Sequence, residues 1–116
     1  MNKDITSRRN LLIKALKEFP EDRHIKGELK SAEGFCASGL ACDVYIQNSP
    51  AQDASWGVGK NYNGFQIGNV VYFFHPSPQV CNFFQIEFGK VLILNDEKGL
   101  TFKEIADSIS KGELNI

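Results

Sequence analysis

The sequence predicts an α+β domain with three or four helices around a buried central helix, together with a small antiparallel β-hairpin or sheet. Apolar residues follow helical spacing near both ends, a middle segment is apolar around its whole circumference, and two β-prone runs flank a Gly-Asn pair. A chain of 116 residues can bury a self-supporting core but is too short for two domains. We therefore expect a single compact domain over residues 1–116.

The first helix is predicted over residues 7–19. Leu12 and Leu16 recur at helical spacing, Ser7 serves as the N-cap, and Pro20 ends the helix. The opposite face holds much of the positive charge of the chain, on Arg8, Arg9, Lys14 and Lys17. We expect this face to be solvated, with nucleic-acid binding through it as an alternative function.

Residues 21–34 are polar and predict a loop with a short extended piece. Residues 35–46 predict a helix that is apolar nearly all round, which places it at the buried centre of the fold. Asp43 lies between the apolar stripes of this helix, and a buried carboxylate must be paired. It either organises the core, through a loop N–H or an ion pair with Arg23 or Lys26, or lines a pocket.

Residues 47–63 are rich in Gly, Asn, Ser and Asp and predict a long loop. Beyond it, Phe65–Ile67 and 70–74 flank Gly68-Asn69, whose glycine supplies the positive φ that a two-residue hairpin turn requires. Aromatic side chains are dense around this hairpin: Tyr62, Phe65, Tyr72, Phe73, Phe74, Phe83, Phe84 and Phe88. They point to both faces, so one face packs on the helices and the other is covered by the long loop or by a partner. We therefore expect a homodimer.

Three further elements are expected between the hairpin and the last helix. Ser77 as N-cap and Pro78 at the first helical position open a short helix that closes near Gly89. The apolar run 91–94 predicts a strand, and residues 95–99 predict a turn.

The last helix is predicted from its N-terminal signals. Thr101 and Glu104 form a capping box, and Leu100 and Ile105 form a hydrophobic staple. Gly112 lies beyond the predicted C-terminus.

The charge balance of the chain argues against a nucleic-acid-binding protein. The chain has 13 Lys+Arg and 14 Asp+Glu and a pI of about 6.1, whereas nucleic-acid binding needs a concentrated basic face. Residues 1–30 nevertheless carry eight basic and five acidic side chains, which permits a local anion site.

The sequence shows neither a membrane span nor the apolar core of a signal peptide, so we expect a cytoplasmic protein without a membrane partner.

The cysteines Cys36, Cys42 and Cys81 are odd in number, and we expect them to be reduced and free of disulfides. Cys36 lies at a predicted helix N-terminus, where the dipole lowers a thiol pKa. A small thiol-dependent hydrolase using Cys36 is therefore an alternative function, with His24 or His75 as the base. The spacing of Cys36 and Cys42 does not fit a zinc site, so we expect neither a metal nor a cofactor.

Four segments carry a resemblance to a family of small phage and prophage proteins: residues 26–29, 34–45, 94–96 and 101–109. That family has a G-F-C-C-L-G-V-x-C-D block near the middle and an L-N-D-x-x-x-x-T-F-x-E-I-A-D motif near the end. Residues 9–16 and 77–84 also resemble it, so the likeness covers most of the chain. This sequence departs from it at Ala37, where a second cysteine is usual, and at Ser38, where leucine is usual.

The resemblance implies a phage or prophage accessory protein in the cytoplasm of a bacterial host. We expect it to act by binding rather than as an enzyme, for example by inhibiting a host defence, through a protein target or a sequestered small anionic or nucleotide ligand. Residues for such a ligand site would supply positive charge, an aromatic stacking surface and the carboxylate of the central helix. The candidates are Arg23, His24, Lys26, Asp43, Trp56 and Tyr62.

Overall fold

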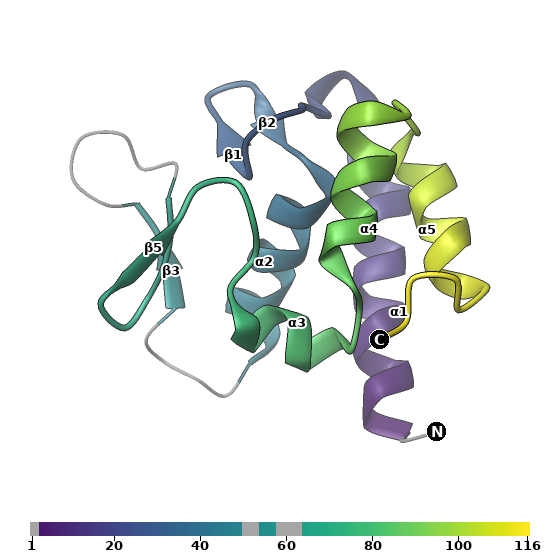
Figure 1. Cartoon of the computed structure of the whole chain (residues 1–116), viewed down its shortest axis with the longest axis horizontal. Coiled ribbons are helices and arrows are strands. Elements are labelled where there is room, and N and C mark those ends of the chain that lie inside the picture. Colours follow the sequence, from purple (N-terminus) through teal and green to yellow (C-terminus); the bar gives the residue numbers. More distant parts are fainter. Residues whose placement is uncertain (1–2, 50–53, 58–63) are drawn as a thin grey trace.

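A computed structural model describes residues 3–49, 54–57 and 64–116 of the chain. The elements follow the order α1 (Lys3–Glu18), β1 (Lys30–Ser31), β2 (Gly34–Phe35), α2 (Ala37–Asn48), β3 (Ala54–Trp56), β4 (Phe65–Ile67), β5 (Val70–Tyr72), α3 (Pro78–Phe84), α4 (Phe88–Leu92) and α5 (Phe102–Ser110). The described part has five α-helices and two small antiparallel sheets, which confirms the α+β class. Figure 1 shows α1, α4 and α5 on one side of α2 and the three-stranded sheet on the other.

Helix α2 is the buried centre that the sequence predicts. Eight of its residues are buried, and it contacts α1, α3 and α4. Cys36 is its N-cap, and the Sγ atom accepts a hydrogen bond from the Gly39 N–H. A Cβ atom at Gly39 would stand 1.7 Å from the carbonyl oxygen of Leu29, so only glycine lets the chain before β1 lie against α2 at this point.

Helix α1 begins at Lys3, four residues before the predicted start, so Ser7 lies inside the helix instead of capping it. The prediction was wrong because a capping residue in the sequence does not exclude a helix that continues past it. Leu12 and Leu16 are buried, as their spacing predicts. The helix packs along α5 and reaches α2 and α3.

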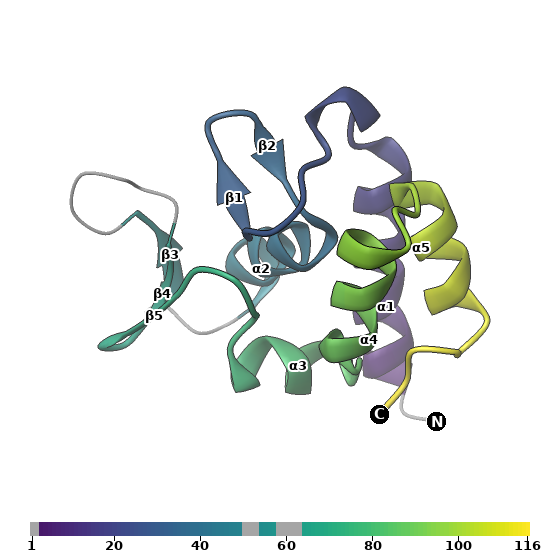
Figure 2. The same cartoon turned by 45° about the horizontal axis from the view of Figure 1, so that its top comes forward.

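The predicted hairpin is present, with Ile67 opposite Val70 across the turn. A third strand, β3, pairs with β4 and gives the order β3-β4-β5. β3 lies inside the segment 47–63 that the sequence predicts as loop, because its formation depends on pairing with β4, which the composition of the segment itself does not reveal. Figure 2 shows this sheet on one side of α2 and the β1–β2 hairpin above that helix.

The run 91–94 is helical and not a strand. It belongs to α4 and to a π-helical turn, Ile93–Glu97, which also replaces most of the predicted turn at 95–99. Short apolar runs are ambiguous between a buried helix and a strand, and here Glu87 caps the helix that contains the run. The preceding helix, α3, ends at Phe84 rather than near Gly89, and Gln85 follows as its C-cap in the left-handed conformation.

Helix α5 begins as predicted. Thr101 Oγ1 accepts a hydrogen bond from the Glu104 N–H, and Glu104 Oε1 accepts one from the Thr101 N–H. This confirms the capping box. The helix ends at Ser110, and Gly112 follows with a φ of 76°.

Candidate functional site

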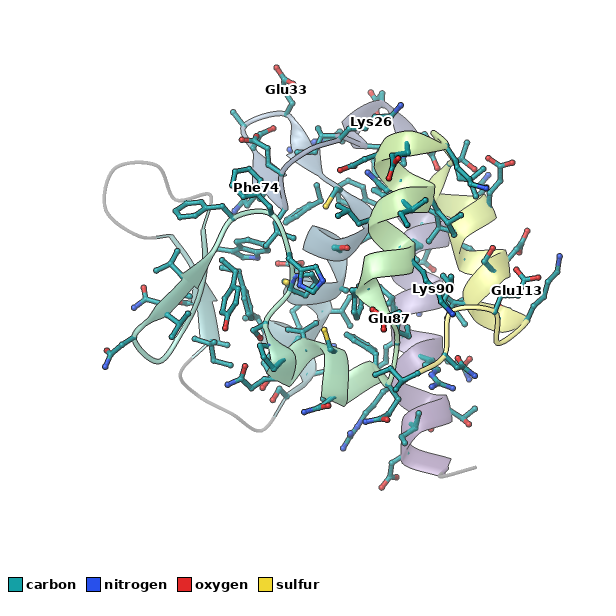
Figure 3. The ribbon with its side chains drawn as sticks, viewed as in Figure 1. Lys26, Glu33, Phe74, Glu87, Lys90 and Glu113 are labelled. Carbon is teal, nitrogen blue, oxygen red and sulfur yellow. The ribbon has the colours of Figure 1, made fainter. Side chains whose placement is uncertain are left out.

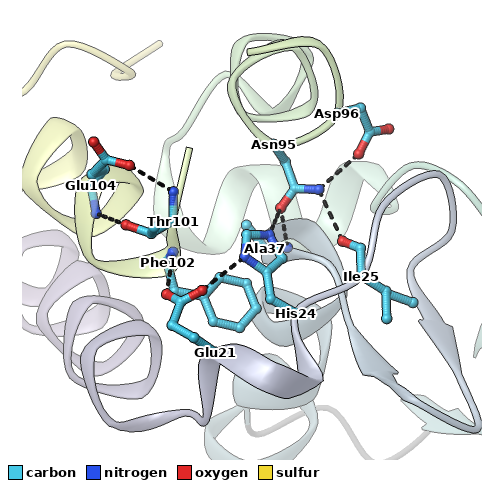
Figure 4. Close-up of polar contacts among 9 residues, drawn as sticks. All are labelled: Glu21, His24, Ile25, Ala37, Asn95, Asp96, Thr101, Phe102 and Glu104. Carbon is cyan, nitrogen blue, oxygen red and sulfur yellow. Dashed lines mark hydrogen bonds and ion pairs between the residues drawn. The ribbon is translucent and has the colours of Figure 1, made fainter. Parts of the chain in front are cut away.

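Asn95 joins three segments that are far apart in the sequence (Figure 4). Its side chain is buried at the π-helical turn. Oδ1 accepts a hydrogen bond from the Ala37 N–H at 3.1 Å, and Nδ2 donates to the Ile25 carbonyl at 3.1 Å. An N–H can only donate and a carbonyl can only accept, so these two contacts determine the orientation of the Asn95 amide. Asn95 therefore links the start of α2 to the chain that precedes β1.

His24 lies in the same network with both ring nitrogens engaged. Nε2 faces Asn95 Oδ1, and Nδ1 faces Glu21 Oε2 at 3.2 Å. Both oxygens only accept hydrogen bonds, so the neutral ring can donate to one of them and the protonated ring to both. The ring also stacks on Phe102, with 3.9 Å between centroids, and Glu21 Oε1 accepts the Phe102 N–H. The turn at Glu21–Arg23 is thus attached to the start of α5.

The segment 23–29 is also held through its backbone. Gly27 donates its N–H to Asp96 Oδ1 at 3.2 Å, and Ile25 donates its N–H to the Phe35 carbonyl at 2.9 Å. A Cβ atom at Gly34 would stand 1.8 Å from the Arg23 carbonyl oxygen, so β2 approaches the segment as closely as glycine allows. The conformation of this segment is therefore set by packing on several sides.

A hollow of about 590 Å³ lies between this segment and the β1–β2 hairpin; we call it the 24–33 hollow. Its lining residues are His24, Ile25, Lys26, Glu28, Ser31, Ala32 and Glu33. Lys26 and Glu33 are labelled in Figure 3 and lie at the same end of the molecule. The exposed charges of the lining are one lysine and two glutamates, so it lacks the excess of positive charge that a phosphate site requires.

The residues proposed for a ligand site lie in two places. Arg23, His24 and Lys26 belong to the segment beside the hollow, where Arg23 Nε donates to the Glu33 carbonyl at 3.3 Å. Lys26 remains exposed, whereas the ring of His24 is occupied by the Asn95 network. Tyr62 lies outside the described residues.

Asp43 and Trp56 meet where α2 contacts β3, and neither residue lines the hollow. Trp56 Nε1 donates to Asp43 Oδ1 at 3.0 Å, so the expected partners of this carboxylate, a loop N–H, Arg23 or Lys26, are replaced by an indole. Asp43 Oδ2 accepts from Gln47. The Lys30 ammonium lies over the Trp56 ring at 5.2 Å from its centroid, so Lys30 takes a position on this ring where a ligand would stack.

Cys36 lies in an environment that disfavours the thiolate form, which is the form that acts as a nucleophile. The side chain is 2% exposed, and burial raises the pKa of its thiol to about 11, although the Gly39 N–H acts in the other direction. The candidate bases are engaged elsewhere: His24 with Glu21 and Asn95, and His75 with the Pro76 carbonyl. The thiol-hydrolase alternative receives no support from this geometry.

Two arginines of the predicted basic face belong to the interior packing. Arg9 is buried and donates from Nε to the Phe84 carbonyl at 2.7 Å and from Nη2 to the Gln85 carbonyl at 2.6 Å. Arg8 lies over the ring of Phe83 at 4.5 Å. Both side chains thus contact the C-terminal end of α3, where free carbonyls need donors. Lys14 and Lys17 are left on the exposed surface of α1.

Sequence reasoning missed the roles of Glu21, Lys30 and Asn95. The Leu-Asn-Asp motif contains Asn95, but turn chemistry was sufficient to explain the motif, and only the fold brings it to Ala37 and Ile25. Nothing in the sequence distinguishes Glu21 or Lys30 from other exposed charges.

The described ranges contain no group of His, Cys, Asp or Glu side chains that could hold a metal ion. Within the same ranges, no helix has both the length and the apolar character needed to cross a bilayer. Comparison with known proteins adds no assignment: no family model, no curated protein and no solved structure matches the chain.

Proposed function

We propose that this chain is a phage or prophage accessory protein that acts by binding a host protein, such as a defence protein, and that the 24–33 hollow is its docking site. The observation that carries the proposal is the Asn95 network, which holds the segment beside the hollow in one conformation while its charged side chains stay exposed. Binding residues are commonly presented in this way, on a loop positioned by a rigid scaffold.

Rigidity of the segment favours binding because less conformational entropy is lost when the partner docks. Contacts to Asn95, Asp96 and Phe35 restrict the backbone before any partner arrives. The charged side chains around the hollow, Lys26, Glu28 and Glu33, can then pair with charges of a partner and select it by complementarity.

A protein partner fits this surface better than a small anion. Glu28 and Glu33 repel a phosphate or carboxylate ligand, and Lys26 is the single lysine in the lining. The ring of His24 has no nitrogen left for a ligand unless the Asn95 network opens. Mixed charges are typical of the polar rim of a protein–protein interface.

The proposal is tested by reversing one charge. A tagged Lys26→Glu protein is expressed in the bacterial host, and the proteins that co-purify are quantified against wild type. Lys103→Glu is the matched control, because Lys103 is an exposed lysine on α5 that is not among the residues lining the hollow.

We expect at least one host protein to be captured by wild type and by Lys103→Glu, and to be reduced about tenfold or more with Lys26→Glu. Equal capture by all three proteins would place the docking site elsewhere. Native mass spectrometry of the same samples covers the other ligand class: a small molecule lost only in Lys26→Glu would assign the hollow to a sequestered anion instead.

A further inference from the structure

One stretch of the surface is apolar and exposed, and the segment that forms it carries no formal charge. Val70 is 51% exposed and Phe74 63%, and they lie on β5 and on the segment after it, whereas Phe73, 43% exposed, lies with Val71 on the other face of the sheet. Residues 61–86 contain no Lys, Arg, Asp or Glu, although the chain has 13 and 14 of these in 116 residues. We call the surface formed by Val70, Tyr72, Phe74, His75 and Pro78 the uncharged face. Patches of this kind on soluble proteins mark interaction surfaces.

The uncharged face has a projecting side chain next to a groove. Phe74 lies on the segment between β5 and α3, as Figure 3 shows. His75, the residue after Phe74, lines a groove of about 470 Å³. The other residues that line this groove are Tyr72, Pro76, Pro78, Cys81 and Asn82. The lining is mainly apolar and includes no charged side chain of Lys, Arg, Asp or Glu.

The edge of the three-stranded sheet also supports an interaction surface in this region. β5 is one of the two outer strands in the order β3-β4-β5 of the described sheet. Outer strands are usually protected from pairing by a charged residue, a proline or a bulge, and Val70–Tyr72 has neither charge nor proline. The Phe73 carbonyl accepts the Leu29 N–H at 2.8 Å, so protection by the rest of the chain begins after the strand has ended.

These features favour a second copy of the same chain over a different partner. In a two-fold interface each patch meets itself, so any charge near the axis would face a like charge. The uncharged face avoids that penalty, and it carries both halves of a reciprocal contact, a projecting ring and an apolar groove. A charged partner, by contrast, would find no complementary charge on this face.

We propose that a second copy of this chain docks on the uncharged face, with Phe74 of each protomer seated in the groove beside Tyr72 and Cys81 of the other. The interface is isologous and closes as a dimer. It leaves the 24–33 hollow outside, because the two surfaces share no residue. The dimer therefore presents the hollow twice.

The first test measures mass in solution across a concentration series, by light scattering or native mass spectrometry. We expect a species of twice 13.0 kDa for wild type. Phe74→Asp should be a monomer, because it introduces charge into the interface, and Leu11→Asp, which alters an exposed leucine on α1, should remain a dimer. A monomeric wild type, or a dimer that Phe74→Asp leaves intact, would overturn the proposal.

The second test joins the two protomers at the proposed contact. Phe74→Cys should form a disulfide-linked dimer with Cys81 of the other copy under mild oxidation, and adding Cys81→Ser should abolish the product. Cys36 and Cys42 are buried and do not interfere. A linked dimer that persists without Cys81 would contradict the proposed contact. Because capture of a host protein depends on Lys26, a monomeric result here leaves the proposed function standing.

Discussion

At the scale of single residues, the most consequential side chain is Asn95. Its side-chain amide accepts hydrogen bonds from the Ala37 N–H and the His24 ring. The same amide donates hydrogen bonds to the Ile25 carbonyl and the Asp96 carboxylate. A buried amide with this many partners cannot be replaced without leaving several groups unpaired, and each of them carries its own desolvation cost.

We expect Asn95→Asp to lower the free energy of unfolding by about 3 kcal/mol, although the shape of the side chain is unchanged. The new carboxylate cannot donate, so one of its oxygens meets the Ile25 carbonyl and the Asp96 carboxylate. Urea denaturation monitored by circular dichroism measures the change. Asn10→Asp, at an exposed position of α1, is the control and should stay within about 0.5 kcal/mol of wild type.

We expect the thiol of Cys36 to make the free energy of unfolding depend on pH. Burial raises its pKa to about 11 in the folded protein, against 9.0 for an unperturbed thiol. Between these values the unfolded chain has lost the proton and the folded chain keeps it, so the free energy of unfolding falls as the pH rises from 9 to 11. The contribution of this group is up to about 3 kcal/mol.

Denaturation at a series of pH values tests this, with Cys36→Ser as the comparison. Serine retains the N-cap acceptor for the Gly39 N–H but does not ionise in this range, so its curve should be flatter above pH 9. Identical slopes for the two proteins would show that Cys36 ionises as readily folded as unfolded.

At the scale of elements, several ends of helices are held by side chains from elsewhere in the chain. Arg9 of α1 donates to carbonyls at the end of α3, and Glu21 accepts the Phe102 N–H at the start of α5. Helix termini have free backbone groups, and these contacts pair some of them without solvent. Short helices such as α3 depend on this kind of tertiary support.

We expect Arg9→Gln to lower the free energy of unfolding by about 2 kcal/mol, because the Phe84 and Gln85 carbonyls lose their charged donor. Lys14→Gln removes the same charge from the exposed side of α1 and should change stability by less than about 0.5 kcal/mol. Thermal denaturation separates the two variants. Equal losses would mean that the charge of α1, and not its contact with α3, is what matters.

At the scale of the whole molecule, three segments that are separated in the sequence meet at the end of the molecule that holds the 24–33 hollow. Residues 26–29 border the hollow, the start of α2 supplies Ala37 to the network, and the Leu-Asn-Asp motif supplies Asn95. The uncharged face lies on other elements, β5 and the start of α3. The two surfaces share no lining residue, and the hydrogen bond from the Leu29 N–H to the Phe73 carbonyl connects the segments that carry them.

Capping residues and turn residues in the sequence correctly predicted the helices and the hairpin turn that they begin or form. The capping box of Thr101 and Glu104 begins α5, Ser77 caps α3, and Gly68-Asn69 forms the hairpin turn, because each depends on residues within a few positions. The burial of α2 also followed from its apolar circumference. Strand β3 and the helical state of 91–94 did not follow, because each depends on what packs against it.

For the candidate site as well, some features follow from the sequence and others only from the tertiary structure. The sequence by itself determined the fold class, the central helix and the presence of Arg23 and Lys26 in a polar segment, since composition and spacing are enough for these. Only the tertiary structure decided that Asp43 pairs with Trp56, that Cys36 is buried, and that Asn95 links Ala37 to Ile25. These are contacts between residues up to 70 positions apart, and no local pattern specifies which distant groups will satisfy a buried donor or acceptor.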